Sequence, residues 1–419
     1  MGWQMRTSRG PFLLAGGALI IVALVANEWV LGRWLTEAGQ LTNPASRLVL
    51  ALFDVTMLAA GLVLLVRRER APWREMLLAV AATLVAVLLA EAGLRTVFAV
   101  RGWISPRDRQ IAKTIGWRPV ANFSSDGDVP GFGRVRYSTT RDGFRVYGDP
   151  ATSKPKILVI GDSYTEAAMV TDGETYYHRL ARARPDLEFF AIGGGGYGTL
   201  QEYLLLDASV DTIKPDVVLL QMHPNDLVNN SHALESRSTT NNNQMNRPYW
   251  EHGRLVARFP ENAAWGPLYN LVRHSYLLRF VNVNLHFMRS RVLDSAERTL
   301  TRDDADVVAA TSVTIELLSM IKKRAGAPVA AFSARPDGLF SFWSESEVCR
   351  RAGIAFIPGV GEAVEAADEA GEHVTGRPVD AHWNSRGHEI AAEVLAAWLA
   401  REGLAQRVGP HAGAQRPGS

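Results

Sequence analysis

Three long apolar segments dominate the first hundred residues of the chain: Phe12 to Leu31, Leu48 to Val66 and Met76 to about Phe98. Each is close to the roughly 20 residues that a helix needs to cross a bilayer. We therefore predict three transmembrane helices that form a membrane anchor over residues 1–101. A cleaved signal peptide is the weaker interpretation of the first segment, because no small-residue cleavage site follows it. Buried helices of a soluble protein are the other alternative.

The arginines near these segments predict an orientation. The loop between the second and third segments holds Arg67, Arg68, Arg70 and Arg74, the densest basic cluster near any of the three. Positively charged loops are retained on the cytoplasmic side of a membrane. The chain after the third segment is therefore expected to be extracytoplasmic, in the periplasm or at the cell exterior, although arginines at the end of that segment weaken the argument.

Short apolar runs alternate with helical patterns in the second part of the chain. Residues 102–153 are rich in Gly, Pro, Asp and Arg and read as a linker with small edge strands. Beyond them, strands are predicted at residues 157–161, 187–192, 217–222, 329–333 and 354–357, and helices at 200–210, 307–324, 345–352 and 387–400. Strands separated by helices pair in parallel through right-handed crossovers. The pattern predicts a three-layer α/β/α domain over residues 154–404, with a mostly parallel sheet of five strands.

One long interruption and a polar tail depart from this alternation. The insertion, at about residues 227–301, begins polar and Asn-rich and turns apolar between Trp265 and Met288, with helical spacing. We expect it to pack on the domain; a mobile lid or a contact with the bilayer surface is the alternative. Residues 405–419, with Gly, Pro and Arg, are expected to be disordered.

Overall composition narrows the class of partner only slightly. Lys and Arg number 45 against 43 Asp and Glu, so no net charge indicates nucleic acid. Cys349 is the only cysteine, so no disulfide can form within the chain and the redox compartment cannot be read from cysteine usage.

Four polar groups follow predicted strands or precede the last predicted helix. Ser163 follows the first strand, a glycine run at residues 193–198 follows the second, and Asn225 lies in the polar stretch after the third. Asp380 and His382 lie just before the last helix. Loops at the carboxyl ends of parallel strands converge on one edge of the sheet. We therefore expect these groups to meet although they are far apart in sequence.

Acyl transfer from an ester needs a nucleophile, a base, a group that orients the base, and donors for the oxyanion. Ser163 can be the nucleophile, His382 the base and Asp380 the group that fixes its tautomer. The oxyanion donors would be the Gly196 N–H, the Asn225 side-chain amide and the Ser163 N–H.

Each piece also has a purely structural interpretation. Ser163 and Asn225 would serve as helix caps, the glycine run as a turn, and Asp380 with His382 as a surface turn. The four pieces together, in this order and at these positions, favour an active site.

These motifs resemble those of the SGNH, or GDSL-type, hydrolase family. The matching blocks are Gly161–Thr165, Gly193–Gln201, Pro224–Asp226 and Asp380–His388, within a region from about Lys154 to Leu399. The resemblance implies a flavodoxin-like sheet in the order 2-1-3-4-5, and no metal or organic cofactor. It also implies Ser163 as nucleophile, Gly196 and Asn225 as oxyanion donors, and Asp380 with His382 as the rest of a catalytic triad.

Three departures from the family pattern stand out. Ala167 replaces the glycine that usually closes the first block, which would narrow the pocket slightly. His223-Pro224 replaces the glycine before Asn225, so His223 offers a second candidate base, although the pattern favours His382. One residue rather than two separates Asp380 from His382, a spacing that resembles SGNH-like proteins that move acetyl groups on envelope polysaccharides.

The sequence thus predicts a membrane-anchored serine esterase of SGNH type. It would cleave acyl esters, chiefly O-acetyl esters, on cell-envelope carbohydrate or lipid through an acyl-enzyme on Ser163. The expected partners are an acylated small molecule or carbohydrate and the membrane, with no nucleic acid. An O-acyltransferase with the same triad and a non-catalytic glycan-binding protein are the alternatives.

Overall fold

The computed structural model divides into two compact units, which are described separately. The first consists of residues 1–101 and 270–292, and the second of residues 102–269 and 293–419. The structure describes residues 10–25, 27, 29–30, 44–66, 72–101, 109–112, 114–238, 241–243, 245–258, 275–278, 300–335, 340 and 342–401. The predicted disordered tail, most of the apolar segment at 265–288 and the arginines at 67–70 lie outside these ranges.

The three apolar segments form the helices of the first unit. They are α1 (Gly10–Val25), α3 (Pro44–Val66) and α4 (Pro72–Arg101), so the prediction of helices there is confirmed. α1 and α3 approach closely at two glycines: a Cβ on Gly16 would lie 2.9 Å from the Gly61 carbonyl oxygen. Any larger residue at either position would push the two helices apart.

The prediction of three transmembrane helices is not supported. Among the residues that the structure describes, no helix is both long and apolar enough to qualify as a membrane span. α1 has 16 residues, and at about 1.5 Å per residue it falls short of a hydrocarbon core about 30 Å thick. Charged residues stand within the two longer helices, at Asp54 of α3 and at Glu91 and Arg95 of α4.

The described part of the insertion belongs to both units. Residues 225–238 and 245–258 lie in the second unit, where they include α8 (Asn225–Asn229), α9 (His232–Arg237), β9 (Arg247–Glu251) and β10 (Arg254–Arg258). Residues 275–278 lie in the first unit, where the Glu91 carboxylate accepts hydrogen bonds from Ser275 Oγ, Tyr276 N–H and Leu277 N–H at 2.8 to 3.1 Å. Whether residues 265–288 form a lid stays a prediction.

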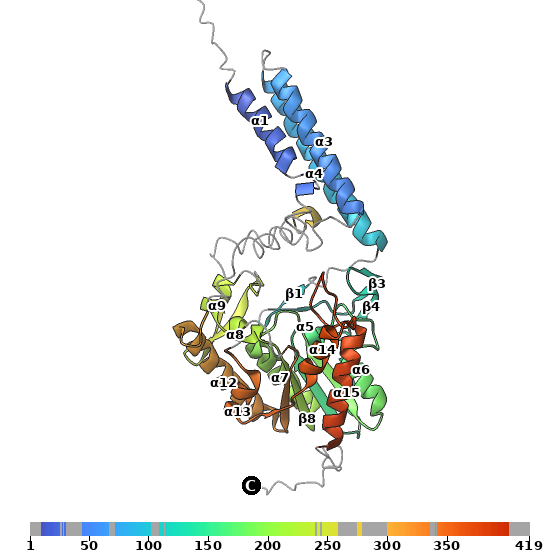
Figure 1. Ribbon diagram of the computed structural model, residues 1–419, viewed down its shortest axis with the longest axis vertical. Helices are drawn as coiled ribbons and strands as arrows, with labels where there is room; N and C mark the ends of the chain where they lie inside the picture. Colours follow the sequence, from blue (N-terminus) through green and yellow to red (C-terminus); the bar gives the residue numbers. More distant parts are fainter. Residues whose placement is uncertain are drawn as a thin grey trace, which may run out of the picture. The chain divides into compact units, whose positions relative to one another are not determined.

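The second unit is built on a six-stranded sheet (Figure 1). Its order is β12-β11-β8-β6-β7-β5, and the first five are parallel neighbours. The parallel strands are β6 (Lys156–Gly161), β7 (Glu188–Gly193), β8 (Val217–Met222), β11 (Val329–Ser333) and β12 (Ala355–Phe356). They run in the predicted order 2-1-3-4-5. A sixth strand, β5 (Val146–Tyr147), pairs antiparallel with β7 at the edge. It lies in the segment where small edge strands were predicted, but it makes the sheet one strand larger than the predicted five.

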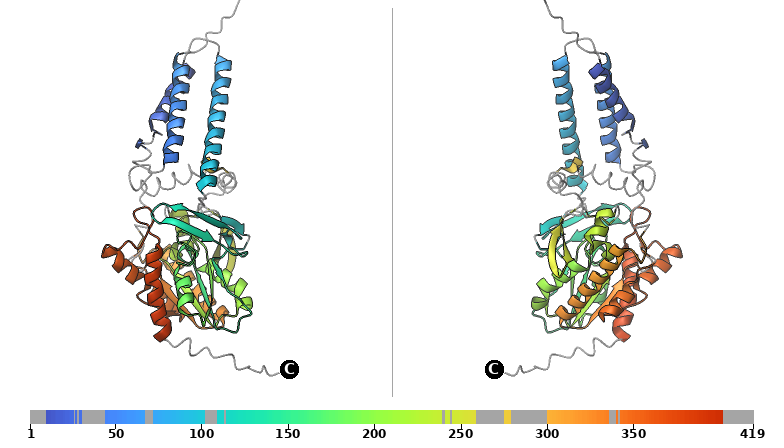
Figure 2. Two further views of the ribbon diagram at one scale, coloured as in Figure 1. Left: turned by 90° about the vertical axis from the view of Figure 1, so that its right-hand side faces the viewer. Right: turned by 90° about the vertical axis from the view of Figure 1, so that its left-hand side faces the viewer.

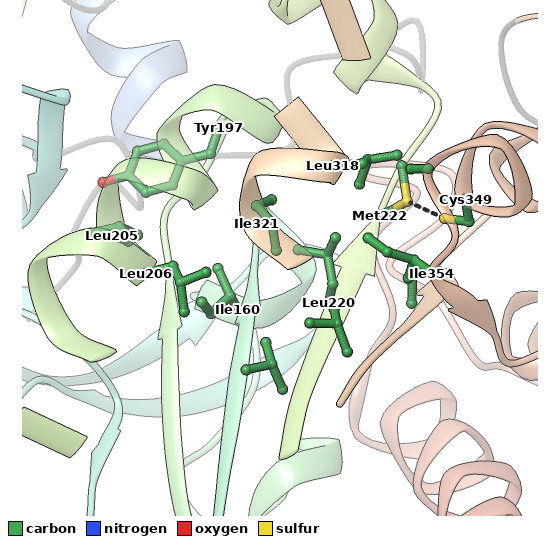
Figure 3. Close-up of a cluster of buried hydrophobic side chains, with 14 of the residues drawn as sticks. Ile160, Tyr197, Leu205, Leu206, Leu220, Met222, Leu318, Ile321, Cys349 and Ile354 are labelled. Atoms are coloured by element: carbon green, nitrogen blue, oxygen red, sulfur yellow. Dashed lines mark hydrogen bonds between the residues drawn. The ribbon is translucent and has the colours of Figure 1, made fainter. Parts of the chain in front are cut away.

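Alternation along the strands divides the core between the two faces of the sheet. Leu158 and Ile160 of β6 contribute to one apolar cluster, and Ile157 and Val159 to the other. The first cluster is covered by α7 (Thr199–Ile213), α12 (Ala305–Ala325) and α13 (Glu345–Ala352). Figure 3 shows its centre, with the Cys349 thiol 3.3 Å from the Met222 sulfur. The second is covered by α6 (Tyr176–Ala183), α14 (Val360–Glu369) and α15 (Ser385–Arg401). The domain is therefore an α/β fold with helices on both faces (Figure 2).

The central strands end level with one another at glycines. Gly161 of β6 is paired with Gly193 of β7. A Cβ on Gly193 would lie 2.8 Å from Thr165 Cβ and 2.9 Å from the Gly161 carbonyl oxygen. No side chain fits here, so the chains that continue from β6 and β7 leave the sheet side by side.

The segment before the sheet forms small strands that pack on the domain. These are β1 (Arg109–Ala112), β2 (Gly116–Pro119), β3 (Ser124–Val129) and β4 (Gly133–Ser138), together with β5. Arg145 lies within this segment and is buried. Its guanidinium donates to the carbonyls of Ala167 and Val170 and to the Asp172 carboxylate, at 2.6 to 2.9 Å. Through Arg145, this edge segment (residues 109–147) fixes the loop at residues 167–172.

Replacing Arg145 by alanine is expected to lower the free energy of unfolding by about 2 to 3 kcal/mol. Two carbonyls lose a buried donor, and the partly buried Asp172 carboxylate loses its charged partner and keeps, among the described residues, only the hydrogen bonds from Ser138. The matched control is Arg134→Ala. The Arg134–Asp126 pair is exposed on both sides, so its loss should cost less than about 1 kcal/mol. Urea unfolding of both variants measures the difference, and equal losses would contradict the anchoring role of Arg145.

Candidate active site

Ser163 stands at the start of the short helix α5 (Ser163–Glu166), directly after β6. Asp162 caps this helix, since its side chain accepts from the Tyr164 N–H at 2.9 Å. The interpretation of Ser163 as the helix cap is therefore wrong. Its side chain is left free for other chemistry at the carboxyl edge of the sheet.

The predicted Ser163, His382 and Asp380 come together. His382 Nε2 lies 2.8 Å from Ser163 Oγ, although 219 positions separate the two residues. The other ring nitrogen, Nδ1, lies 2.5 Å from Asp380 Oδ1. An ionised carboxylate can only accept, so this contact places the ring proton on Nδ1 and leaves Nε2 to accept the serine proton.

The short spacing between Asp380 and His382 has a geometric reason. Asp380 Oδ1 accepts from the backbone N–H of His382 at 2.9 Å as well as from its ring. A carboxylate that bonds the N–H two residues ahead closes an Asx turn, so one intervening residue is sufficient. Asn384 then caps α15 by accepting from the N–H groups of Arg386 and Gly387 at 2.9 and 3.2 Å.

Aromatic contacts hold the imidazole of His382 in place. The ring of Tyr164 lies 4.8 Å from that of His382, 5.3 Å from that of His223 and 5.0 Å from that of Trp383, measured between centroids. Burial lowers the pKa of His223 to about 3, and its Nδ1 accepts from the Asn225 N–H at 3.2 Å. His223 is therefore a neutral structural residue next to the site, and it is His382 that contacts Ser163.

Two acid–base groups at the site have shifted pKa values. Burial alone would lower the pKa of His382, but the charge and hydrogen bond of Asp380 outweigh it and raise that pKa above 6.5. The carboxylates of Asp162 and Glu166 act in the same direction. Burial raises the pKa of Asp162 itself to about 6, against the hydrogen bond from Tyr164 N–H.

Gly196 occupies a backbone conformation that suits glycine alone. Its φ is +72°, and a Cβ there would collide with the side chain of Asn243. The Gly196 N–H has no hydrogen-bond partner among the described residues, whereas the Gly196 carbonyl accepts from Arg247 Nη2 at 2.5 Å. An unpaired N–H at the end of β7 is compatible with the role of oxyanion donor, which stays a prediction.

Asn225 begins α8 at the end of β8 and is 9% exposed. Its buried Oδ1 has no hydrogen-bond partner within the described residues. Because an amide oxygen only accepts, it is the Nδ2 group of this side chain that would serve as the predicted second donor. The structural alternative, a cap that bonds its own helix, is not observed.

The structure gives Ala167 a role in the backbone of the turn that was not expected from the sequence. It terminates α5 in the left-handed conformation, with φ +47°, and its carbonyl accepts from Arg145 Nη1 at 2.6 Å. Glycine adopts this conformation without strain, which explains why a glycine would suit the position. The alanine at this position therefore affects the backbone conformation of the turn, and not only the width of a pocket.

Two residues at the site were missed from the sequence, Glu166 and Trp117. The buried Glu166 carboxylate accepts from the Gly195 N–H, and Trp117 Nε1 donates to the Gly195 carbonyl at 3.0 Å. A glutamate two residues after Tyr164 and a tryptophan in a polar linker carry no local signal for these contacts. Within the described residues, no three His, Cys, Asp or Glu side chains are placed to hold a metal ion.

Solved structures with a similar fold include several lipolytic proteins. A member of the lipolytic protein G-D-S-L family from Veillonella parvula is 13% identical, covers 59% of this chain and all of its own, and has a TM-score of 0.35. A lipase/acylhydrolase from Enterococcus faecalis is 13% identical, with coverage of 62% and 100% and a TM-score of 0.32. A putative GDSL-like lipase from Parabacteroides merdae is 13% identical, with coverage of 60% and 96% and a TM-score of 0.33.

No family model matches the chain, and a search of curated proteins finds no match. Identities near 13% and TM-scores near 0.3 say nothing about the reaction. The geometry around Ser163 therefore carries the proposals that follow.

Proposed function

We propose that this chain is a serine ester hydrolase of the SGNH type with Ser163 as its nucleophile. The observation that carries the proposal is the continuous hydrogen-bonded series Asp380–His382–Ser163, at 2.5 and 2.8 Å, at the carboxyl edge of a parallel sheet. The Gly196 N–H, which has no partner among the described residues, and the side-chain amide of Asn225 follow the two strands that flank β6. This set supplies every part that acyl transfer requires.

The first half-reaction forms an acyl-enzyme. Ser163 Oγ attacks the ester carbonyl while His382 Nε2 takes the hydroxyl proton, and Asp380 stabilises the imidazolium that results. The carbonyl electron pair moves onto oxygen, where the N–H groups of Gly196 and Ser163 and the Asn225 amide would donate hydrogen bonds. When the carbon–oxygen single bond breaks, the leaving alcohol takes the proton back from His382.

The second half-reaction releases the acyl group. A water molecule gives a proton to His382 Nε2 and attacks the acyl carbon, a second oxyanion forms, and Ser163 leaves as the hydroxyl. If a sugar hydroxyl takes the place of water, the same residues transfer the acyl group, so the enzyme would be an O-acyltransferase. The compact Asp380-Ala-His382-Trp383 sequence favours acetyl groups on envelope carbohydrate as the substrate class.

Hydrolysis and transfer are separated by offering p-nitrophenyl acetate with and without an acceptor glycan. Release of acetate at the same rate in both conditions supports the esterase. Acetylated glycan, with a matching loss of free acetate, supports the transferase. Neither p-nitrophenol release nor acetate from the folded full-length chain would contradict both and favour a non-catalytic glycan-binding protein.

The dependence of activity on pH should follow His382. The imidazole accepts the serine proton only when neutral, so kcat/KM is expected to fall as pH drops through its pKa, which lies above 6.5. In Asp380→Asn the charge that raises this pKa is gone while burial still lowers it, so the acid limb should move to lower pH. The value of kcat should also fall, by up to about 10⁴-fold, because the amide no longer fixes the tautomer.

The control for Asp380→Asn is Asp186→Asn. Asp186 pairs with Arg184 at the surface and should leave the pH profile unchanged. An acid limb that stays in place in Asp380→Asn would assign it to another group, of which Asp162, with a pKa of about 6, is the first candidate.

We also propose that the catalytic domain acts outside the cytoplasm. The support is the arginine-rich stretch at residues 67–74, between two apolar segments. Fusions after residue 401 provide the test in a bacterial host. An active alkaline phosphatase fusion is expected, and a fluorescent cytoplasmic reporter in its place would refute the location.

A further inference from the structure

Every polar backbone group around the Gly195–Gly196 peptide has a partner except one. Glu166 accepts from the Gly195 N–H, Trp117 Nε1 donates to the Gly195 carbonyl, and Arg247 Nη2 donates to the Gly196 carbonyl. The group left over among the described residues is the Gly196 N–H, the proposed oxyanion donor.

The bond from Trp117 determines where that N–H points. The Gly195 carbonyl and the Gly196 N–H belong to the same peptide plane, and in a trans peptide the two point in opposite directions. Trp117 Nε1 holds the carbonyl on one side at 3.0 Å. The N–H must therefore project from the other side of the plane, away from Trp117. In a glycine run, whose backbone has the widest choice of conformations, such a restraint matters most.

A second hydrogen bond, donated in the opposite direction, links Trp117 to the glycine run. Tyr197 Oη donates to the Trp117 carbonyl at 2.7 Å, and the two rings lie 5.9 Å apart with an interplanar angle of 53°. Trp117 is fully buried. Gln201 Nε2 of α7 donates to the carbonyl of Ile115, the residue before β2, at 2.7 Å. The strand β2 is thus fastened to the run and to the helix that follows it.

The insertion also contacts the same tryptophan. The Arg247 guanidinium lies 4.9 Å from the centre of the Trp117 ring while it bonds the Gly196 carbonyl. Arg247 is itself held by the buried carboxylate of Glu235, at 3.0 Å, and by the Asn229 carbonyl, at 3.0 Å. A buried guanidinium with these partners has one orientation, so it fixes the indole face as well as the peptide.

We propose that Trp117, backed by Arg247, is a positioning residue that aims the Gly196 N–H at the oxyanion. The inference rests on the proposed function and extends it, because it gives a catalytic purpose to the edge segment and to the insertion. Neither residue touches the substrate. Trp117 acts through the Gly195 carbonyl, and its contribution appears only when charge develops on the ester oxygen.

Trp117→Phe tests the proposal, since it removes the indole N–H and keeps an aromatic ring beside Arg247 and Tyr197. With p-nitrophenyl acetate, kcat should fall about tenfold, less than the 10² to 10³ typical of losing an oxyanion donor itself. KM should stay within about twofold, because the ground state gains little from the donor. The acid limb of the pH profile should not move, since His382 is untouched. Inhibition by phenylboronic acid, which mimics the tetrahedral state, should weaken by about the same factor as kcat.

The matched control is Trp250→Phe. Trp250 Nε1 donates to Glu316 at 2.9 Å, a bond of similar length that involves no group of the glycine run, and its loss should leave kcat unchanged. Equal kcat values in the two variants would overturn the proposal. So would a fall in kcat accompanied by a shifted acid limb, which would indicate general loosening of the site.

Tyr197→Phe keeps the test open if Trp117→Phe does not fold. This variant removes the hydrogen bond from Tyr197 Oη to the Trp117 carbonyl. It should also lower kcat and leave KM unchanged. A wild-type kcat in this variant would count against the proposal. A wild-type chain that does not hydrolyse the ester at all would instead refute the proposed function.

Discussion

Replacing Ser163 by alanine is expected to abolish ester hydrolysis, with a fall in kcat of at least about 10⁴-fold. The side chain lost is the one whose oxygen lies 2.8 Å from His382 Nε2, and no covalent acyl-enzyme can form without it. Residual turnover would come from water held near the oxyanion donors. Initial rates with p-nitrophenyl acetate at several protein concentrations measure the loss.

Ser209→Ala is the control for this variant. Ser209 lies on α7 and donates to the Leu205 carbonyl of its own helix at 2.6 Å, so its loss should leave kcat within about twofold. The Ser163→Ala protein should also unfold within about 1 kcal/mol of wild type, because a single partly exposed hydrogen bond is removed. A Ser163→Ala protein that retains a tenth of the wild-type kcat would show that another group is the nucleophile.

Replacing His382 by alanine should have the second largest effect, again a loss in kcat of about 10⁴-fold or more. In the proposed mechanism this imidazole moves the proton in both half-reactions, so its removal should affect both. The competing candidate, His223, should behave differently. With a pKa lowered to about 3 by burial, it is neutral throughout the working range and contacts Tyr164 rather than Ser163.

His223→Ala is therefore expected to keep kcat within about tenfold of wild type. A modest loss is expected because the Asn225 N–H loses the acceptor that His223 Nδ1 provides. Steady-state kinetics of the two histidine variants, measured side by side at pH 8, make the comparison. The reverse ranking would mean that the base comes from the loop after β8.

The sheet could be read from the sequence because its strands are short apolar runs with sharp boundaries. β6 is a buried run between Pro155 and Asp162, and its partners have the same character. Small edge strands were predicted within residues 102–153, but the sequence could not show that the two-residue strand β5 joins the main sheet. Two residues carry no periodicity, and the place of β5 depends on its pairing with β7. The apolar N-terminal segments were correctly predicted as helices, but hydropathy over 20 residues predicted membrane spans that the described helices do not support.

The candidate site could be predicted as far as its groups follow the strand ends. Ser163, Gly196 and Asn225 come two or three residues after β6, β7 and β8 in the sequence, so the topology alone brings them to one edge. His382 and Asp380 were found from their position before the last helix. Their distance from Ser163, by contrast, depends on the tertiary structure and could not be predicted from the sequence.

The supporting contacts could not be predicted in this way. Trp117 reaches the Gly195 carbonyl across 78 positions and Arg247 reaches the Gly196 carbonyl across 51. Both come from segments with no strong periodicity, where side-chain direction is set by packing on the finished domain rather than by local preference. The left-handed Ala167 is a similar case, because only the structure gives its φ of +47°.

The central claim is that His382 activates Ser163 as a nucleophile, and labelling with a fluorophosphonate tests it most directly. Intact mass and peptide mapping of the full-length chain should show one adduct, on Ser163. The Ser163→Ala protein should remain unmodified and the His382→Ala protein should react far more slowly. A folded wild-type chain that acquires no adduct, or that carries it on another residue, would contradict the account.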